Sequence, residues 1–304
     1  MMVFISRMYH ILQKASMGDR VLKIVEYAYA KLNLGLKILG LRSDGFHNIL
    51  SVFQTVDLCD RLVFEPAGQG QIILSCDDAD LPTGPENLVY KAVLAFRSYT
   101  EMDRGVEVVI EKRIPMAAGL GGGSSDAAAV LRVLNRVWEA GLSDGELREI
   151  GATLGSDVPF FVRQKGTAVV SGRGEIMRYV PWSADVAYVL VCPGFQVHTG
   201  WAFANYKKTL TGHGEYDSFI NSVKDLPVSG FWGRIENDFL PLIVQSHPET
   251  RDILSRLTDA GAIVASMSGS GSTLYGVFES RDVAEAVWAG FKADQFRAFL
   301  CCPV

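Results

Sequence analysis

The sequence lacks the cysteine patterns that build disulfide frameworks and zinc sites. Its five cysteines are scattered and include no Cys-x-x-Cys pair. Both kinds of site need paired spacings, so neither is expected. We predict reduced thiols in a cytoplasmic protein. The cysteines are Cys59, Cys76, Cys192, Cys301 and Cys302.

The sequence also lacks a large excess of either charge, and it lacks long apolar runs. The 29 Lys and Arg residues and the 34 Asp and Glu residues give a net charge of -5, without a long block of either sign. Proteins that grip a nucleic-acid backbone usually carry a basic surplus, so no nucleic-acid partner is expected. A small anion held by backbone N–H groups stays open. No apolar run reaches about 18 residues, so no membrane span is predicted.

A secretory signal is not predicted either. Residues 1–19 lack a long apolar segment followed by a small-residue cleavage site. We expect these residues to form a disordered N-terminal extension ahead of a domain that begins near Val21. A true start at Met17 fits the sequence equally well.

The rest of the sequence predicts an α+β fold in two domains. Hydrophobic residues make up 48% and charged residues 21%, the balance of a globular protein with a substantial core. Strands and helices mix without a regular βαβ rhythm, which argues against a doubly wound parallel sheet. We place one domain at residues 20–180 and a second at 181–304, and we predict a monomer or a weak homodimer.

Hydrophobic periodicity predicts the main elements. From Leu32 to Ile38 apolar residues alternate with the others, which is the period of a half-buried strand. Asn87 opens a helix, and the spacing of Ser143 and Glu146 predicts a capping box at the start of another. Further strands are expected at residues 50–64, 70–75, 106–111, 186–192 and within 262–279, and helices at 127–140, 250–260 and 281–292.

A glycine-rich loop joins a strand to a helix at residues 119–126. It reads Gly-Leu-Gly-Gly-Gly-Ser-Ser-Asp, and we expect Ser124 or Ser125 to cap the helix. Backbone N–H groups at a helix start converge on one point, and residues without side chains let a phosphate approach it closely. The alternative is that the glycines only permit tight packing of the helix on the strand.

Phosphate loops of other kinds do not match this segment. A Walker A loop needs a lysine after its last glycine, and none follows here. In the dinucleotide fingerprint Gly-x-Gly-x-x-Gly, the third glycine would fall on Ser124 or Asp126. The His-Arg-Asp and Asp-Phe-Gly signals of protein kinases are missing. The loop therefore predicts a different nucleotide site.

Three separated motifs resemble those of the GHMP kinase superfamily, which includes galacto-, homoserine, mevalonate and phosphomevalonate kinases. They are Ala-Lys-Leu-Asn-Leu at 30–34, the segment 115–129, and Met-Ser-Gly-Ser-Gly-Ser-Thr at 267–273. The extra loop glycine and the segments 42–47, 155–161 and 236–240 are similar to one branch of the superfamily, whose acceptor carries a diphosphocytidyl group. The resemblance runs from about residue 22 to the C-terminus.

The resemblance implies ATP-dependent phosphorylation of the 2-hydroxyl of a diphosphocytidyl-methylerythritol substrate in the non-mevalonate isoprenoid pathway. It also implies an N-terminal domain similar to a ribosomal-protein α+β unit, a ferredoxin-like C-terminal domain and an active site between them. The implied ligands are ATP, Mg²⁺ and the small cytidyl substrate. The alternatives are another GHMP kinase, acting on homoserine, mevalonate or a sugar, and a non-catalytic nucleotide-binding protein of the same fold.

By resemblance, Asp157 is the base that deprotonates the acceptor hydroxyl, and Lys31 is its partner. A lysine beside a carboxylate keeps the carboxylate ionised and ready to accept a proton. The same ammonium can stabilise charge that develops on the attacking oxygen or on the γ-phosphate. The alternative is that Asp157 caps the helix that follows it and that Lys31 is solvated.

The ATP site implied by the resemblance is the glycine loop and its surroundings. The alternatives are helix capping for Asn87 and a solvated side chain for Lys112. The Mg²⁺ ligand is unknown, with Ser124, Ser125 and Asp126 as candidates. The ATP-binding residues are Lys112, Pro115, Ala117, Ala118, Gly119, Leu120, Gly121, Gly122, Gly123, Ser124, Ser125 and Asn87.

The substrate site implied by the resemblance has two ends. Asn33 would bind the methylerythritol end, together with Asp157. His47 would pair with the cytosine edge, and Phe46, where the family commonly has Tyr, would stack on the base. Thr199 and Phe203 would form a second wall, with Phe203 on the opposite face of the base. Simple core packing is the alternative for this last pair.

Overall fold

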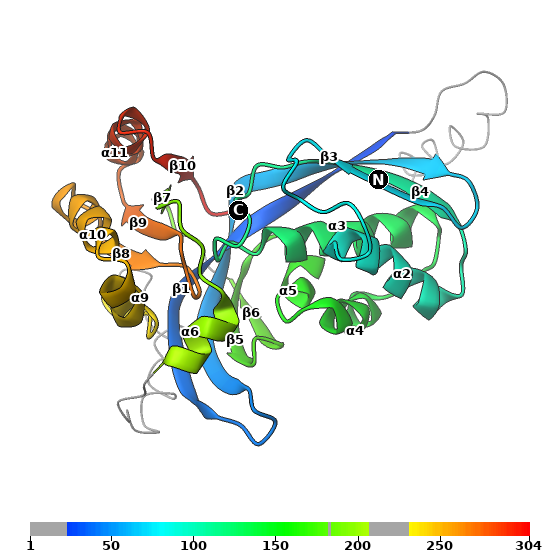
Figure 1. Cartoon of the computed structure of the whole chain (residues 1–304), viewed down its shortest axis with the longest axis horizontal. Helices are drawn as coiled ribbons and strands as arrows, with labels where there is room; N and C mark the ends of the chain where they lie inside the picture. Colours follow the sequence, from blue (N-terminus) through cyan, green and yellow to red (C-terminus); the bar gives the residue numbers. More distant parts are fainter. Residues whose placement is uncertain (1–22, 182–183, 207–230) are drawn as a thin grey trace.

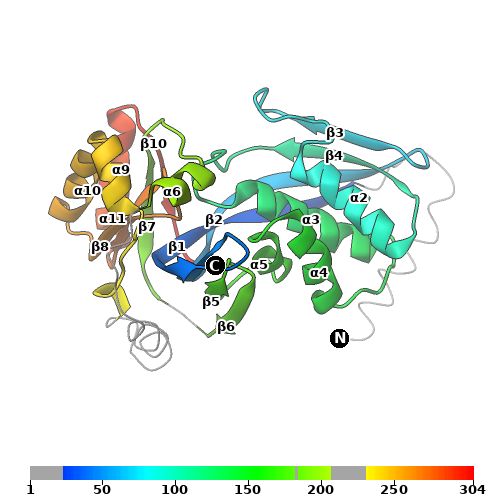
Figure 2. The same ribbon diagram turned by 60° about the horizontal axis from the view of Figure 1, so that its bottom comes forward.

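The described part of the chain folds into two β-sheets, each covered by helices (Figures 1 and 2). The computed structural model describes residues 23–181, 184–206 and 231–304, and the predicted extension at 1–19 lies outside them. The prediction of an α+β fold is confirmed. Within the described residues, no helix is both long enough and apolar enough to cross a membrane.

Two long antiparallel strands form the centre of the first sheet. The strand β1 (Ile24–Leu41) runs along one edge of β2 (His47–Ala67), and two strands share the other edge of β2. Register shifts bend the β1–β2 ribbon, and Gly35, at a φ of 83°, lies within one of them. The remaining strands are β3 (Ile72–Cys76), β4 (Gly105–Glu111), β5 (Thr167–Gly172) and β6 (Ile176–Val180), in the order β3-β4-β2-β5-β6.

Four helices pack against this sheet and bury its apolar face. Asn87 caps α2 by accepting the Val89 N–H at 2.8 Å, and the predicted capping box of Ser143 and Glu146 is present at the start of α4. Alanine and valine side chains of α3 pack with those of β2 and β4 in one core cluster. The helices are α2 (Leu88–Thr100), α3 (Gly122–Val137), α4 (Asp144–Leu154) and α5 (Val158–Val162).

The second sheet is antiparallel throughout, in the order β10-β7-β9-β8. Its strands are β7 (Ala187–Cys192), β8 (Val264–Met267), β9 (Leu274–Phe278) and β10 (Arg297–Cys301). Its core includes side chains from all four helices described after residue 184. They are α6 (Thr199–Asn205), α9 (Leu240–Ser246), α10 (Glu249–Asp259) and α11 (Arg281–Ala293).

A third core cluster joins the two sheets, and β1 supplies its centre. Ala30, Leu32 and Leu34 are fully buried there and pack with Tyr188 and Tyr275 of the second sheet. Side chains alternate across a strand, so the residues between these three point to the other face. That alternation turns Lys31 toward Asp157, and it turns Asn33 toward Ser51.

The helix after the glycine loop starts earlier than its sequence pattern indicates. It begins at Gly122 instead of residue 127, and Gly121 occupies the N-cap position without a side-chain cap. The prediction that Ser124 or Ser125 caps the helix is therefore wrong. The Ser125 N–H already donates to the Gly121 carbonyl at 2.9 Å, which places both serines inside the first turn.

Three short strands were not predicted from periodicity: β5, β6 and β10. Each has five or six residues, too few to show a clear period. Their pairing with longer strands decides their conformation. The first sheet ends at Val180 and the second begins at Ala187. The division of the chain into domains near residue 180 stays a prediction.

Candidate active site

The glycine loop makes a tight turn that only some residues can adopt. Gly119 and Gly121 have φ values of 77° and 70°, and Ala117 has a φ of 51°. A Cβ at residue 121 would lie 2.9 Å from the Phe161 ring and 3.2 Å from Lys31 Cγ. The first N–H groups of a helix have no partner within it. The loop thus aims the open N-terminal end of α3 at the region beside Lys31.

Lys31 and Asp157 face one another across the start of α3. Lys31 Nζ lies 3.7 Å from Asp157 Oδ2 and also donates a hydrogen bond to Asn33 Oδ1. The Lys31 side chain is 5% exposed and the Asp157 side chain 28% exposed. Burial lowers the pKa of the Lys31 ammonium, and the charge of Asp157 partly opposes that shift. The site therefore presents a desolvated cation beside a carboxylate that solvent can reach.

The helix-capping alternative for Asp157 is wrong. Asp157 occupies the N-cap position of α5, but its side chain makes no capping hydrogen bond. Its φ and ψ are -88° and -18°, which is helical backbone and not the extended backbone typical of an N-cap. The alternative of a solvated Lys31 is also wrong, because the side chain is buried. The carboxylate of Asp157 is left for another partner.

A loop of the second sheet docks directly on the glycine loop. Ser268 Oγ accepts the Asn33 N–H at 3.1 Å and donates to the Gly119 carbonyl at 2.9 Å. The Thr273 N–H donates to the Ala118 carbonyl at 3.2 Å. Asn237 holds the docking loop by donating to the carbonyls of Met267 and Gly269. The sequence predicts that the loop 268–273 closes the cleft, but neither Ser268 nor Asn237 was among the predicted catalytic or binding residues.

Two of the residues predicted for the cytosine, His47 and Phe203, come from different halves of the chain and meet in space. The rings of His47 and Phe203 stack, with centroids 5.0 Å apart and planes at 17°. Phe46 is 54% exposed at the end of the β1–β2 ribbon. Thr199 Oγ1 lies 3.0 Å from Ser270 Oγ. Phe203 also packs edge-on against Phe239, so it touches both the apolar core and His47.

Two residues predicted to bind ATP are engaged in other contacts. The ammonium of Lys112 is 2% exposed and pairs with Asp60 and Asp126, so the solvated alternative for Lys112 is wrong. Gly122 leaves room for this ammonium, because a Cβ there would lie 3.1 Å from it. The capping alternative for Asn87 is confirmed, and its amide also donates to the Pro82 carbonyl at 2.6 Å. Contact of either residue with the nucleotide stays a prediction.

A largely buried arginine links the three elements that carry the site. Arg132 of α3 donates to Glu26 of β1 through Nε and Nη2, at 3.1 and 2.9 Å. Its Nη1 donates to the Phe161 carbonyl at the end of α5. The strand that carries Lys31, the helix behind the glycine loop and the helix that follows Asp157 are therefore tied at one point.

We expect replacement of Arg132 by methionine to lower the free energy of unfolding by about 3 kcal/mol, because the largely buried carboxylate of Glu26 then keeps only its longer contacts with Arg136 and Gln164. Urea denaturation of the two proteins measures the change. Arg136→Met is the matched control: this arginine contacts the same Glu26 at 3.4 Å but is 58% exposed. Its loss should cost less than about 1 kcal/mol. Equal losses in the two variants would contradict the link.

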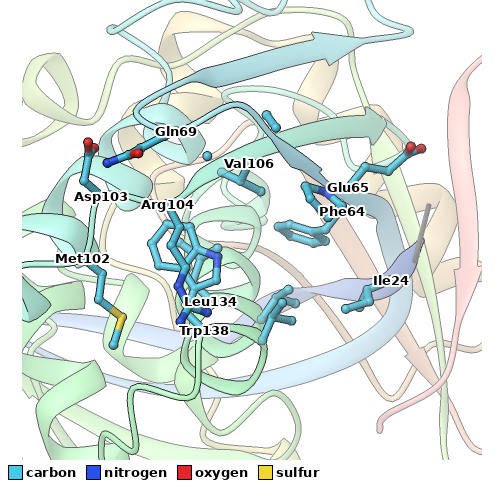
Figure 3. Close-up of a pocket in the computed structure, with 15 residues that line it drawn as sticks. Ile24, Phe64, Glu65, Gln69, Met102, Asp103, Arg104, Val106, Leu134 and Trp138 are labelled. Carbon is cyan, nitrogen blue, oxygen red and sulfur yellow. The ribbon is translucent and has the colours of Figure 1, made fainter. Parts of the chain in front are cut away.

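A separate apolar cavity of about 580 Å³ lies at the far end of α3 (Figure 3). Val133, Leu134 and Val137 of the last turns line it, together with Phe64 and Trp138. The glycine loop is at the opposite end of the helix. None of the predicted site residues lines this cavity.

Comparisons with known proteins support the resemblance to GHMP kinases and the two-sheet fold. The chain matches the GHMP kinases N terminal domain over residues 87–165 and the GHMP kinases C terminal domain over 231–297. A crystal structure of 4-(cytidine 5'-diphospho)-2C-methyl-D-erythritol kinase superposes with a TM-score of 0.76 at 30% identity, covering 91% of this chain and 98% of the other. Homoserine kinase from Cytophaga hutchinsonii, at 19% identity and a TM-score of 0.70, shares the fold.

A relative in sequence narrows the assignment from the GHMP kinases to one family among them. The 4-diphosphocytidyl-2-C-methyl-D-erythritol kinase of Chlorobium phaeobacteroides is 40% identical over 281 residues, which is 91% of this chain and 96% of the relative. The two family matches and the superposition over most of both chains define the class, and the protein is a phosphotransferase of the GHMP kinase class. Within the class, the chain belongs to the 4-diphosphocytidyl-2-C-methyl-D-erythritol kinase family.

Proposed function

We propose that the protein transfers the γ-phosphoryl group of ATP to the 2-hydroxyl of 4-diphosphocytidyl-2-C-methyl-D-erythritol, a step in the synthesis of isoprenoid precursors. One observation carries the mechanism: the Lys31–Asp157 pair adjoins the glycine loop. A Cβ built at Gly121 of that loop would lie 3.2 Å from Lys31 Cγ. A phosphate on the loop and an alcohol on Asp157 would then be neighbours. Phosphoryl transfer depends on that positioning and on charge neutralisation.

In this proposal Asp157 accepts the proton of the acceptor hydroxyl as the oxygen attacks the γ-phosphorus. The bond between that phosphorus and the β,γ-bridging oxygen breaks, and ADP leaves. Lys31 stabilises the negative charge that spreads over the transferred group. Its burial strengthens this effect, because a charge interacts more strongly where water is excluded. Asn33 orients the ammonium through its side-chain oxygen.

The two ends of the acceptor would occupy different parts of the site. The methylerythritol end would lie at Asn33 and Asp157, and the cytosine at His47 and Phe46. The stacked pair of His47 and Phe203 supports a base site at the junction of the two sheets. Phe203 would leave His47 to stack on the base. Thr199 lies on α6 with Phe203, and its hydroxyl forms a hydrogen bond with that of Ser270.

The triphosphate would lie on the backbone of residues 119–125, and Mg²⁺ would accompany it. Among residues 23–181, 184–206 and 231–304, no cluster of three or more His, Cys, Asp or Glu could hold a metal alone. Asp126 is 3% exposed and already paired with Lys112. Ser124 is partly exposed in the first turn of α3 and fits as one oxygen ligand beside the phosphates. The ion would neutralise phosphate charge when bound.

A coupled assay of ADP release over several acceptors tests the proposal. We expect turnover with 4-diphosphocytidyl-2-C-methyl-D-erythritol and none with homoserine, mevalonate or galactose. Activity on mevalonate but not on the cytidyl alcohol would assign the protein to another GHMP kinase function. ATP binding without phosphorylation of any acceptor would point to the non-catalytic alternative.

We also expect kcat/KM to fall as the pH rises into the alkaline range. Burial lowers the pKa of Lys31 from its usual 10.5, so the ammonium loses its proton at a lower pH than a free lysine does. Activity then declines as the pH passes this lowered pKa, because the cation that stabilises the transferred phosphoryl group is lost. The pH dependence of kcat/KM measures the decline, and Lys31→Gln should have little activity and no such limb. A wild-type profile that stays flat up to the pKa of free lysine would contradict the role.

A further inference from the structure

The turn between β5 and β6 lies beside both ends of the proposed acceptor site. Gly174 of this turn is close to Asp157, the proposed general base. A Cβ at residue 174 would lie 3.9 Å from Asp157 Oδ1 and 3.5 Å from Ser156 Cβ. The preceding residue, Arg173, reaches the other way, with its guanidinium carbon 4.9 Å from the centroid of the Phe46 ring. In Figure 2 the β5–β6 hairpin lies next to the bend of the β1–β2 ribbon.

The guanidinium of Arg173 is weakly neutralised. Its Nε lies 3.9 Å from Glu175 Oε1, which is beyond hydrogen-bonding distance, and the side chain is 44% exposed. Glu175 uses its other oxygen to accept the backbone N–H of Arg173 at 2.5 Å, and so holds the turn. Asp44 also interacts electrostatically with Arg173, but Arg42 Nε lies 3.1 Å from both of its oxygens.

The other cations near this place are already engaged. Lys31 is held by Asn33 and Asp157 inside the site. Arg42 is held by Asp44 and also donates to Asn48 Oδ1 at 3.0 Å. An acceptor with its base at Phe46 and its alcohol at Asp157 carries a diphosphate between those two groups. Arg173 is an exposed cation that reaches Phe46, and its neighbour Gly174 lies beside Asp157.

We propose that Arg173 binds the diphosphate of the acceptor and is a specificity-determining residue of the site. The proposal rests on the function proposed above, and it adds a subsite for the part of the substrate that links base and alcohol. A guanidinium presents paired N–H donors that match phosphate oxygens, and such charge-assisted bonds are stronger than neutral ones. Stacking on Phe46 keeps the guanidinium plane close to the base.

Kinetics of Arg173→Met test the subsite. Methionine keeps the unbranched apolar stem of the side chain and removes its charge. We expect KM for the cytidyl acceptor to rise about 10- to 100-fold, the range for a lost hydrogen bond to a charged group. KM for ATP should stay the same, because the triphosphate lies on a different loop. Arg173→Lys should recover part of the loss. Arg178→Met, an exposed arginine on β6 of the same hairpin, is the matched control and should keep the wild-type KM.

Binding of two substrate fragments shows whether Arg173 contacts the diphosphate or only helps to hold the cytosine. Calorimetry should show that the wild-type protein binds cytidine 5'-diphosphate more tightly than cytidine and that Arg173→Met binds both with similar affinity. An equal loss of affinity for both fragments would mean that Arg173 only supports the Phe46 ring, and it would overturn the inference. A wild-type KM in Arg173→Met would overturn it too. If the wild-type protein fails to use the cytidyl acceptor, the proposed function falls first, and the inference falls with it.

Discussion

Replacement of Asp157 by asparagine should lower kcat by about 1,000-fold, which is within the range for removal of a general base. The amide has nearly the shape of the carboxylate, but it cannot take the hydroxyl proton. The affinity for ATP should stay close to that of the wild type, because the proposed phosphate site is made of backbone groups at the start of α3. Steady-state kinetics of ADP release and calorimetry with ATP measure the two quantities.

Asp144→Asn is the matched control for this substitution. It makes the same chemical change at the start of the neighbouring helix α4, where the side chain is 69% exposed and pairs with Arg148 at 3.6 Å. Its kcat should equal that of the wild type. Wild-type turnover in Asp157→Asn would remove the base from the mechanism. The double variant Lys31→Met, Asp157→Asn should lose little more than either single variant, because residues that act as a unit are not additive.

The substitution Gly119→Ala should damage both the fold and the binding of ATP. Residue 119 has a φ of 77°, which costs a side-chain-bearing residue about 1–2 kcal/mol. In addition, a Cβ there would lie 2.3 Å from the Ser268 carbonyl oxygen and 3.0 Å from that of Gly271. The docking loop must move to relieve this collision. We expect a loss of about 3 kcal/mol in the free energy of unfolding, together with a KM for ATP at least tenfold higher.

Gly141→Ala separates the cost of backbone strain from the cost of the collision. Gly141 has a φ of 70°, but a Cβ there meets nothing within 4 Å. Thermal and urea unfolding of this control should show a loss of about 1–2 kcal/mol, and its KM for ATP should not change. If the two variants were equally stable, contact between the glycine loop and the second sheet would not contribute to stability.

Local sequence rules located the glycine loop but not its conformation. Gly119 to Asp126 is recognisable because few other segments combine so many glycines with the start of a helix. The serines were expected to cap that helix, yet the helix begins at Gly122. A left-handed conformation at Gly121, beside the Phe161 ring, starts the helix earlier than side-chain capping preferences indicate. Packing against another element decided where it begins.

The surroundings of single polar residues were also hard to predict. Lys112 follows a strand and could equally have been solvated, but it is buried between Asp60 and Asp126. Nothing near it in the sequence indicates Asp60 as a partner. Ser268 lies within a recognised motif, but its hydrogen bonds to Asn33 and Gly119 appear only once the two sheets are packed together. Arg173 carries no motif, and only its place beside Phe46 and Asp157 draws attention to it.

By itself, the sequence determined the local features: the alternation of β1, the capping box of α4, the cap of α2 and the glycine loop. Each depends on residues a few positions apart, whose preferences act wherever the segment lies. The tertiary structure alone decided the approach of Lys31 to Asp157, the stacking of His47 on Phe203 and the docking of Ser268 on the glycine loop. Those contacts join residues far apart in the chain, so they exist only when both sheets pack on the buried side chains of β1.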